Sequence, residues 1–285
     1  METGVLKVLC LDFSGTVKPE SIDGKHILLL GMCRDIKKVF AVPLVYKSQL
    51  PETINSIVEN VRATYSLDLS ERLIEWVRMD NEPTNTSKAV DQVLRQLRIG
   101  TAPIVPHNSE QAGSIERLMR TMFDAIKCNI RNVDHKLWSY CSQYCADVWD
   151  RIPHTYANMP EYNGMTPIEI LESRVGRNST KNADMLKRFG CLCYFRDQGP
   201  KTKLHSQWRR GVHLGLCPKS TACKIATWTK DIRGIDRWTE YSTIDVKFRK
   251  NILIDDVESL RDKAKGIPLY VPLNFYFSLP YKLRW

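Results

Sequence analysis

Several signals that would place this chain in a membrane or a secretory pathway are missing from its 285 residues. No basic segment followed by an apolar stretch occurs at the N-terminus, so we expect no signal peptide. Residues 266–285 are the most apolar segment, but three prolines interrupt them, so we expect no membrane-spanning helix. The sequence also contains no internal repeat and no low-complexity tract.

The cysteines lack the spacing of a metal site. There are nine, an odd number, and none forms a Cys-x-x-Cys pair. Cys141 and Cys145 are four residues apart on an expected helix, and Cys191 and Cys193 alternate on an expected strand. Neither pair has partners at zinc-ligand spacing. We therefore expect reduced, mostly buried thiols, which are typical of an intracellular protein.

Positive charge is present in excess, but only in one segment. Residues 1–186 contain 22 Lys and Arg and 23 Asp and Glu, whereas residues 187–250 contain 15 and 5. The second segment therefore carries a net charge of +10, equal to the formal charge of the whole chain. Such a concentration favours a polyanionic partner, most simply nucleic acid. The alternative is a solvated basic surface.

The first two thirds of the chain predict an α/β fold, a mixed five-stranded sheet flanked by helices. Tight connections between the first three apolar runs indicate an antiparallel meander. We expect strands at residues 5–13, 27–33, 39–45, 73–79 and 99–105. We expect helices at residues 51–65, 87–97, 136–149 and 167–174, and a long one that begins near residue 109.

After Arg188 the pattern changes to short apolar runs separated by Gly, Pro, Lys and Asp. The runs are residues 191–195, 211–216, 223–229 and 241–248. They predict a small all-β, barrel-like module. We thus expect a core over residues 1–176, a basic β-domain over 184–250, and a C-terminal tail over 251–285 to which we assign no role.

Three acidic residues stand where strands end or a long helix begins. Asp12 lies at the end of the first expected strand and Asp80 follows the fourth, while Glu116 lies in the long helix and is separated from Asp80 by 35 residues. Phosphodiester transfer uses two Mg²⁺ ions roughly 3.5–4 Å apart, and Mg²⁺ prefers hard oxygen ligands. Three such carboxylates could converge on metal. However, a chain with 32 acidic residues contains many such triples, most of them solvated.

The segments around these acids resemble the catalytic core of the retroviral integrase superfamily, specifically the integrases of copia-type retrotransposons. Asp12 lies in VLCLDFSGTVKP, Asp80 in WVRMDNEP and Glu116 in PHNSEQAGSIERLMRTMF. The last segment contains the family's Gln-x-Gly-x-x-Glu-Arg pattern at residues 111–117. GKHILLLGMCRDIKKVFAVPLVYKSQ, NGMTPIEIL and WRRGVHLGLCPKSTACKIAT extend the resemblance over about residues 5–250, in the family's order.

This resemblance implies an RNase H-like core that inserts DNA into DNA. Asp12 would bridge two Mg²⁺ or Mn²⁺ ions, Asp80 would complete one metal site and Glu116 the other, and a 3′-hydroxyl would attack a target phosphodiester. The partners would be the element's DNA ends and the target duplex, with a homo-multimer and nuclear location also implied. The expected DNA contacts are Asn81, Gln111 and Arg117, and in the basic segment Lys201, Lys203, Arg209 and Arg210.

Departures from the family pattern leave other functions open. Glu82 stands where the family often has glycine, and from these 285 residues we expect no counterpart of the family's upstream His/Cys zinc-binding domain. One alternative is a non-catalytic nucleic-acid-binding remnant or a domesticated fragment of such an element. Another is an RNase H-like nuclease that cuts without joining. Trp208, Trp228 and Trp238 could stack on bases, although we expect them to pack in the core.

Overall fold

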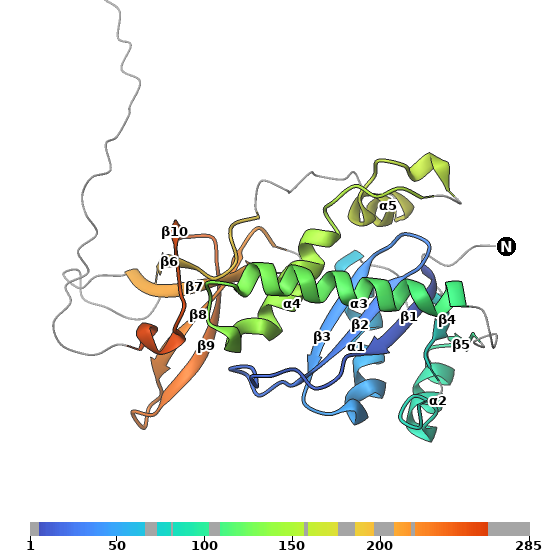
Figure 1. The fold of residues 1–285 in the computed structure, drawn as a ribbon, viewed down its shortest axis with the longest axis horizontal. Helices are drawn as coiled ribbons and strands as arrows, with labels where there is room; N and C mark the ends of the chain where they lie inside the picture. The colour runs from blue at the N-terminus through green and yellow to red at the C-terminus, as the bar shows by residue number, and fades with distance from the viewer. Residues whose placement is uncertain are drawn as a thin grey trace, which may run out of the picture.

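Two five-stranded sheets with helices between them make up the structure, a computed structural model (Figure 1). It describes residues 6–65, 73–80, 82–102, 109–156, 159–175, 186–196, 208–217 and 220–261, with side chains of the helix that begins at residue 109 described from Gly113. Within these residues, no helix is both long and apolar enough to cross a membrane. The thiols are mostly buried, as expected, at Cys10, Cys33, Cys141, Cys145, Cys191 and Cys193.

The first sheet has the strand order β3-β2-β1-β4-β5. Its strands are β1 (Leu6–Phe13), β2 (Ile27–Cys33), β3 (Val39–Leu44), β4 (Ile74–Arg78) and β5 (Gly100–Thr101). The first three form the expected antiparallel meander, whereas β4 and β5 run parallel to β1. Parallel neighbours need crossover connections, and here these contain helices α1 (Leu50–Tyr65) and α2 (Lys88–Gln96). The prediction of a mixed sheet flanked by helices is therefore confirmed.

Each face of this sheet is covered by different helices. On one face, α1 buries a stripe that includes Ile54, Ile57 and Val61, and α5 (Pro167–Arg174) adds Ile170 and Leu171 to the same cluster. The other face is covered by α3 (Ser109–Ile130) and α4 (Trp138–Trp149). Since strand side chains alternate between faces, every second residue of β1 and β4 points toward the α3 side.

The second sheet is antiparallel throughout, with the order β10-β6-β7-β8-β9. Its strands are β6 (Cys191–Arg196), β7 (Trp208–Leu216), β8 (Cys223–Lys230), β9 (Asp236–Thr243) and β10 (Val246–Leu253). The prediction of one strand over residues 241–248 is wrong. A turn at Ile244 and Asp245 divides that segment, and the Thr243 hydroxyl accepts a hydrogen bond from the Asp245 amide at 3.2 Å.

This turn also shows how strongly the second sheet curls. Only two residues separate β9 from β10, yet the two strands form opposite edges of the sheet. The Arg196 amide donates to the Asp245 carbonyl at 3.3 Å, which holds the turn beside β6. Because β9 and β10 form no ladder within the described residues, the module is an open curled sheet rather than a closed barrel.

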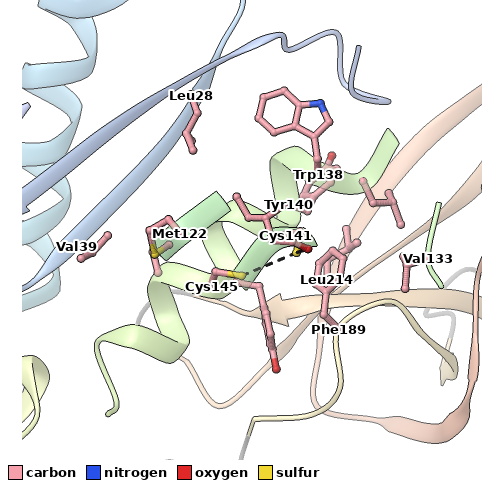
Figure 2. Packing of buried hydrophobic residues seen from close by; sticks show 14 of the residues in the cluster. Leu28, Val39, Met122, Val133, Trp138, Tyr140, Cys141, Cys145, Phe189 and Leu214 are labelled. Carbon is pink, nitrogen blue, oxygen red and sulfur yellow. Dashed lines mark hydrogen bonds between the residues drawn. The ribbon is translucent and has the colours of Figure 1, made fainter. Parts of the chain in front are cut away.

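Helices α3 and α4 belong to one hydrophobic cluster with both sheets. Figure 2 shows Val39 of β3 and Met122 of α3 on one side of this cluster, with Leu214 of β7 and Phe189 on the other. Cys141 and Cys145 lie between them on α4, with their sulfur atoms 4.0 Å apart. The cluster continues into the short helix η5 (Val257–Leu260). Both η5 and the end of β10 therefore lie beyond residue 250, where the β-domain was expected to end. The expected boundary near residues 176–184 lies outside the described residues, and the domain limits stay a prediction.

Candidate active site

The pairing of β1 with β4 places two aspartates side by side. Cys10 is paired with Arg78 in this parallel ladder, and two more residues along each chain lead to Asp12 and Asp80. Asp12 alternates with Val8 and Cys10, whose side chains join the cluster on the α3 side of the sheet. The two aspartates thus stand at the carboxyl ends of adjacent parallel strands, on the face that α3 covers.

Glu116 approaches the same edge from the beginning of α3. Its neighbours Ile115 and Leu118 are buried against the sheet, whereas Glu116 itself is exposed. The expected apolar stripe of α3 is therefore slightly rotated, because Leu118 is buried where Met119 was expected and Met119 is half-buried. This rotation leaves the Glu116 carboxylate at the border between the sheet and solvent.

The charges of these acids act on Asp12. Burial raises the pKa of the half-buried Asp12 above its usual value, and the nearby charges of Asp80, Glu116 and Glu82 raise it further. A hydrogen bond from the Phe13 backbone amide partly offsets the shift. Four carboxyl groups therefore interact at one edge of the sheet, and their negative charge favours the binding of a cation.

Asn85 is a residue of this site that the sequence analysis did not find. Its side chain is only 6% exposed, and its Nδ2 donates hydrogen bonds to Oδ1 of Asp80 and, at 3.3 Å, to the Asp80 carbonyl. The backbone N–H of Asn85 also donates a hydrogen bond to the Glu82 carbonyl at 2.9 Å, which closes the turn between the two residues. The Oδ1 atom of Asn85 is buried and has no partner within the described part of the chain. Asn85 thus fixes one oxygen of Asp80 and leaves the other available.

Lys47 is the second residue that sequence reasoning missed. Its Nζ lies 2.6 Å from a Glu82 carboxylate oxygen and 5.2 Å from the centre of the Phe13 ring. Glu82, which replaces the glycine frequent in the family pattern, is therefore paired rather than an isolated additional charge. Both side chains are more than a third exposed, so solvent screens the pair and its contribution to stability is small.

The donor atoms at this edge have the chemistry that Mg²⁺ requires. Carboxylate oxygens are its usual protein ligands, and a divalent cation would compensate the negative charges of Asp80, Glu116 and Glu82 that add to the effect of burial on the pKa of Asp12. The geometry is not a finished cage, because no three His, Cys, Asp or Glu side chains among the described residues converge closely enough to hold a metal. Asp12, Asp80 and Glu116 thus fit the ion in type and charge.

The described residues among the remaining predicted DNA contacts lie on α3 and on β7 of the second sheet. Arg117 is exposed on α3, where its guanidinium lies 3.4 Å from the point a Cβ of Gly113 would occupy. Arg209 and Arg210 are on β7, far along the chain from the acids, and their side chains leave opposite faces of the strand. Asn81, Lys201, Lys203 and the side chain of Gln111 lie outside the described residues.

The fold and the site define an α/β protein with a carboxylate cluster at the ends of two parallel strands. No protein-family model and no curated protein matches the chain. Among solved structures, it is similar to the catalytic core domain of BIV integrase in crystal form I, with 16% sequence identity and a TM-score of 0.43. The match covers 59% of this chain and 95% of that one. No functional conclusion follows from so distant a likeness.

Proposed function

We propose that this protein is a polynucleotidyl transferase, an RNase H-like integrase of the kind that copia-type retrotransposons encode, which joins DNA 3′-ends to a target duplex. The proposal is supported by the β1–β4 register, in which Cys10 pairs with Arg78 two residues before Asp12 and Asp80, and by the charge interaction of Asp12 with Asp80 and Glu116. The sequence motifs around the same three residues support it independently. The basic segment over residues 187–250 supports a DNA partner.

In this reaction a 3′-hydroxyl oxygen forms a bond to a target phosphorus while the bond from that phosphorus to the adjacent 3′-oxygen breaks. Two bound Mg²⁺ or Mn²⁺ ions would activate the attacking oxygen and stabilise the leaving one. Asp12 would bind both ions, and Asp80 and Glu116 would bind one each. Asn85 would keep Asp80 in one orientation, and Arg117 would contact a DNA phosphate.

A strand-transfer assay with Asp80→Asn tests this function. The wild-type chain, a duplex oligonucleotide with free 3′-ends and a supercoiled plasmid should give joined products with Mg²⁺ or Mn²⁺. Asp80→Asn should reduce joining by at least about 100-fold, because a neutral amide is a poor ligand for a hard cation. The matched control is Asp124→Asn, which removes a solvent-exposed carboxylate from α3 outside the cluster. Metal-independent joining, or equal joining by Asp80→Asn, would refute the catalytic proposal.

A second function, DNA binding without catalysis, is favoured by two observations. The described acids do not converge into a ready metal cage, and Lys47 already neutralises Glu82 beside them. A binding protein of this kind would show salt-sensitive, sequence-independent affinity that Asp80→Asn leaves unchanged. The same plasmid assay separates the functions, because joined strands indicate an integrase, nicked strands a nuclease, and intact plasmid a binding protein. Nuclear location and multimer formation would follow from integrase action.

A further inference from the structure

The β8–β9 hairpin extends beyond the rest of the second sheet. The two strands are paired along their whole length, from Cys223 with Thr243 to Lys230 with Asp236. In contrast, the pairing of β8 with β7 ends at Ala226. The last four residues of β8 and their partners on β9 therefore form a two-stranded ribbon, which projects at the lower left of Figure 1.

The base of this ribbon is held rigidly. Trp228 and Trp238 are cross-strand partners, and their rings meet edge to face with centres 5.6 Å apart. The Trp228 indole donates a hydrogen bond to the Val257 carbonyl at 3.1 Å, and the Arg261 guanidinium covers the Trp228 ring at 4.1 Å. Both tryptophans pack against the shared hydrophobic cluster, as expected from the sequence, and Trp228 also contacts η5.

The turn at the end of the ribbon is equally well fixed. The Asp231 carboxylate accepts hydrogen bonds from the amides of Arg233 at 2.8 Å and Ile235 at 3.0 Å. It also pairs with Arg237 at 3.0 Å, and Gly234 adopts the positive φ of 76° that the turn requires. The turn therefore keeps its shape without any partner molecule.

What this rigid turn presents to solvent is unusual for a free surface. Ile232 is fully exposed and Ile235 is more than half exposed. Lys230 and Arg233 flank them, are exposed, and form no ion pair with any described residue. The acids nearby are compensated, since Asp231 pairs with Arg237 and Asp236 with Arg261. The tip is thus an apolar point between two unpaired cations.

We propose that residues 230–235 enter a groove of duplex DNA, with Ile232 against the bases and Lys230 and Arg233 against phosphates. This inference rests on the DNA partner of the proposed function and assigns the segment that contacts it. A two-stranded β-ribbon fits the major groove of B-DNA, and apolar side chains at protruding positions are known to contact or unstack bases. Two copies meeting tip to tip would oppose like charges, so DNA fits this surface better than a second copy of the chain.

The test separates the apolar contact from the charged ones by salt. Binding of a duplex of about 30 base pairs would be followed by fluorescence anisotropy. The salt concentration would be varied between about 50 and 300 mM, a range over which phosphate contacts make the affinity depend strongly on salt. Ile232→Ala should weaken DNA binding about 5- to 50-fold at every salt concentration. This range corresponds to losing the burial, against the DNA, of half to all of the three side-chain carbons that isoleucine has and alanine lacks. Lys230→Ala and Arg233→Ala should each reduce the slope of log affinity against log salt by about one unit.

The matched control is Ile244→Ala, because Ile244 is 73% exposed in the turn between β9 and β10 of the same sheet. It should bind DNA as the wild type does, and Ile232→Leu should restore most of the affinity lost in Ile232→Ala. Since the Ile232 side chain is fully exposed, its substitution should leave the thermal melting of the chain unchanged.

Three other results would each contradict a different part of the proposal. If the wild type binds DNA and Ile232→Ala binds equally well, the ribbon assignment is wrong while the proposed function stands. If the wild type binds no DNA at low salt, both fail. If sedimentation shows that Ile232→Ala dissociates a dimer without changing DNA affinity, the tip is an interface between copies and the assignment to DNA is overturned.

Discussion

The ion pair between Lys38 and Asp150 connects the edge of the first sheet to the end of α4, and it offers a sharp test of the packing described above. The Lys38 ammonium contacts one oxygen of the Asp150 carboxylate, and the other oxygen accepts the Val39 amide at 2.9 Å. The side chains are 15% and 3% exposed. Burial lowers the pKa of Lys38, but the charge and hydrogen bond of Asp150, together with the nearby Tyr65 and Asp147, raise it by more in sum, so the pKa of Lys38 lies above its usual value.

Removing one partner should be much more destabilising than removing both. Asp150→Ala leaves a buried ammonium without its counter-ion, which costs about 3–5 kcal/mol. It also leaves the Val39 amide unpaired, which adds about 1–3 kcal/mol. Asp150→Asn retains an acceptor for that amide, so only the first loss applies. The double variant Lys38→Met/Asp150→Asn contains no unpaired charge and should lose no more than about 1 kcal/mol.

Urea unfolding followed by circular dichroism at pH 7 measures the free energies of unfolding of the wild type, Lys38→Met, Asp150→Asn and the double variant, the four corners of the double-mutant cycle that isolates the pair. We expect a coupling energy of at least about 2 kcal/mol between Lys38 and Asp150. If Asp150→Asn loses less than about 1 kcal/mol, or if the double variant is as unstable as the single ones, then water reaches this pair and the described burial is incorrect.

Three further predictions concern the acid cluster and the cleft beside α4. Asn85→Ala should weaken Mn²⁺ binding about tenfold in an electron paramagnetic resonance titration, because the variant releases the Asp80 carboxylate from its hydrogen bond. Equal Mn²⁺ affinity of the variant and the wild type would show that Asn85 does not orient Asp80. Lys47→Ala should tighten Mn²⁺ binding about two- to fivefold and Glu82→Gln should weaken it, because each variant changes one charge near Asp12. Unchanged Mn²⁺ affinity in both variants would show that the Lys47–Glu82 pair does not act electrostatically on the acids. Burial in the cleft raises the pKa of Asp147 to about 6, and the neighbouring Asp150 adds to the shift while Arg151 opposes it, so its charged form opposes folding above that pH. Asp147→Asn should therefore melt at a higher temperature than the wild type at pH 7.5 but not at pH 4. The gain in the free energy of unfolding should be less than about 1 kcal/mol, because 43% of the Asp147 side chain is exposed.

Much of the first sheet could be predicted because local sequence signals agree with the tertiary fold there. The strand expected at residues 27–33 has those bounds in the structure, and the helix expected at 167–174 begins after the Thr166 cap that pairs with Glu169. Apolar runs bounded by turns also gave β6, β7 and β8 to within a few residues. These elements are set by hydrophobic period and by capping, both of which are visible in one dimension.

The remainder depends on contacts between distant segments. Nothing near Lys47 in the sequence indicates that it pairs with Glu82, because the contact exists only once the segment before α1 and the turn after β4 come together in the fold. Asn85 is a different case, since a polar turn just after Asp80 is visible and a search for side chains that orient the acid could have found it. The division of residues 241–248 was missed because Ile244, fully apolar, occupies an exposed turn where the pattern predicts a strand interior.

Helix α3 packs on the first sheet and on α4, and α4 packs in turn on β7 of the second sheet, so α3 acts as a rod between the two. Its 22 residues span roughly 33 Å, with Glu116 near one end and Ile126 in the shared cluster toward the other. A stiff rod held at both ends transmits displacement, so a tilt imposed at the second sheet changes the position of Glu116. Free-energy linkage is reciprocal, and any preference that DNA on the second sheet has for one tilt must return as an equal change in cation affinity at the acids. Measuring DNA affinity with and without Mn²⁺ would give the size of that coupling.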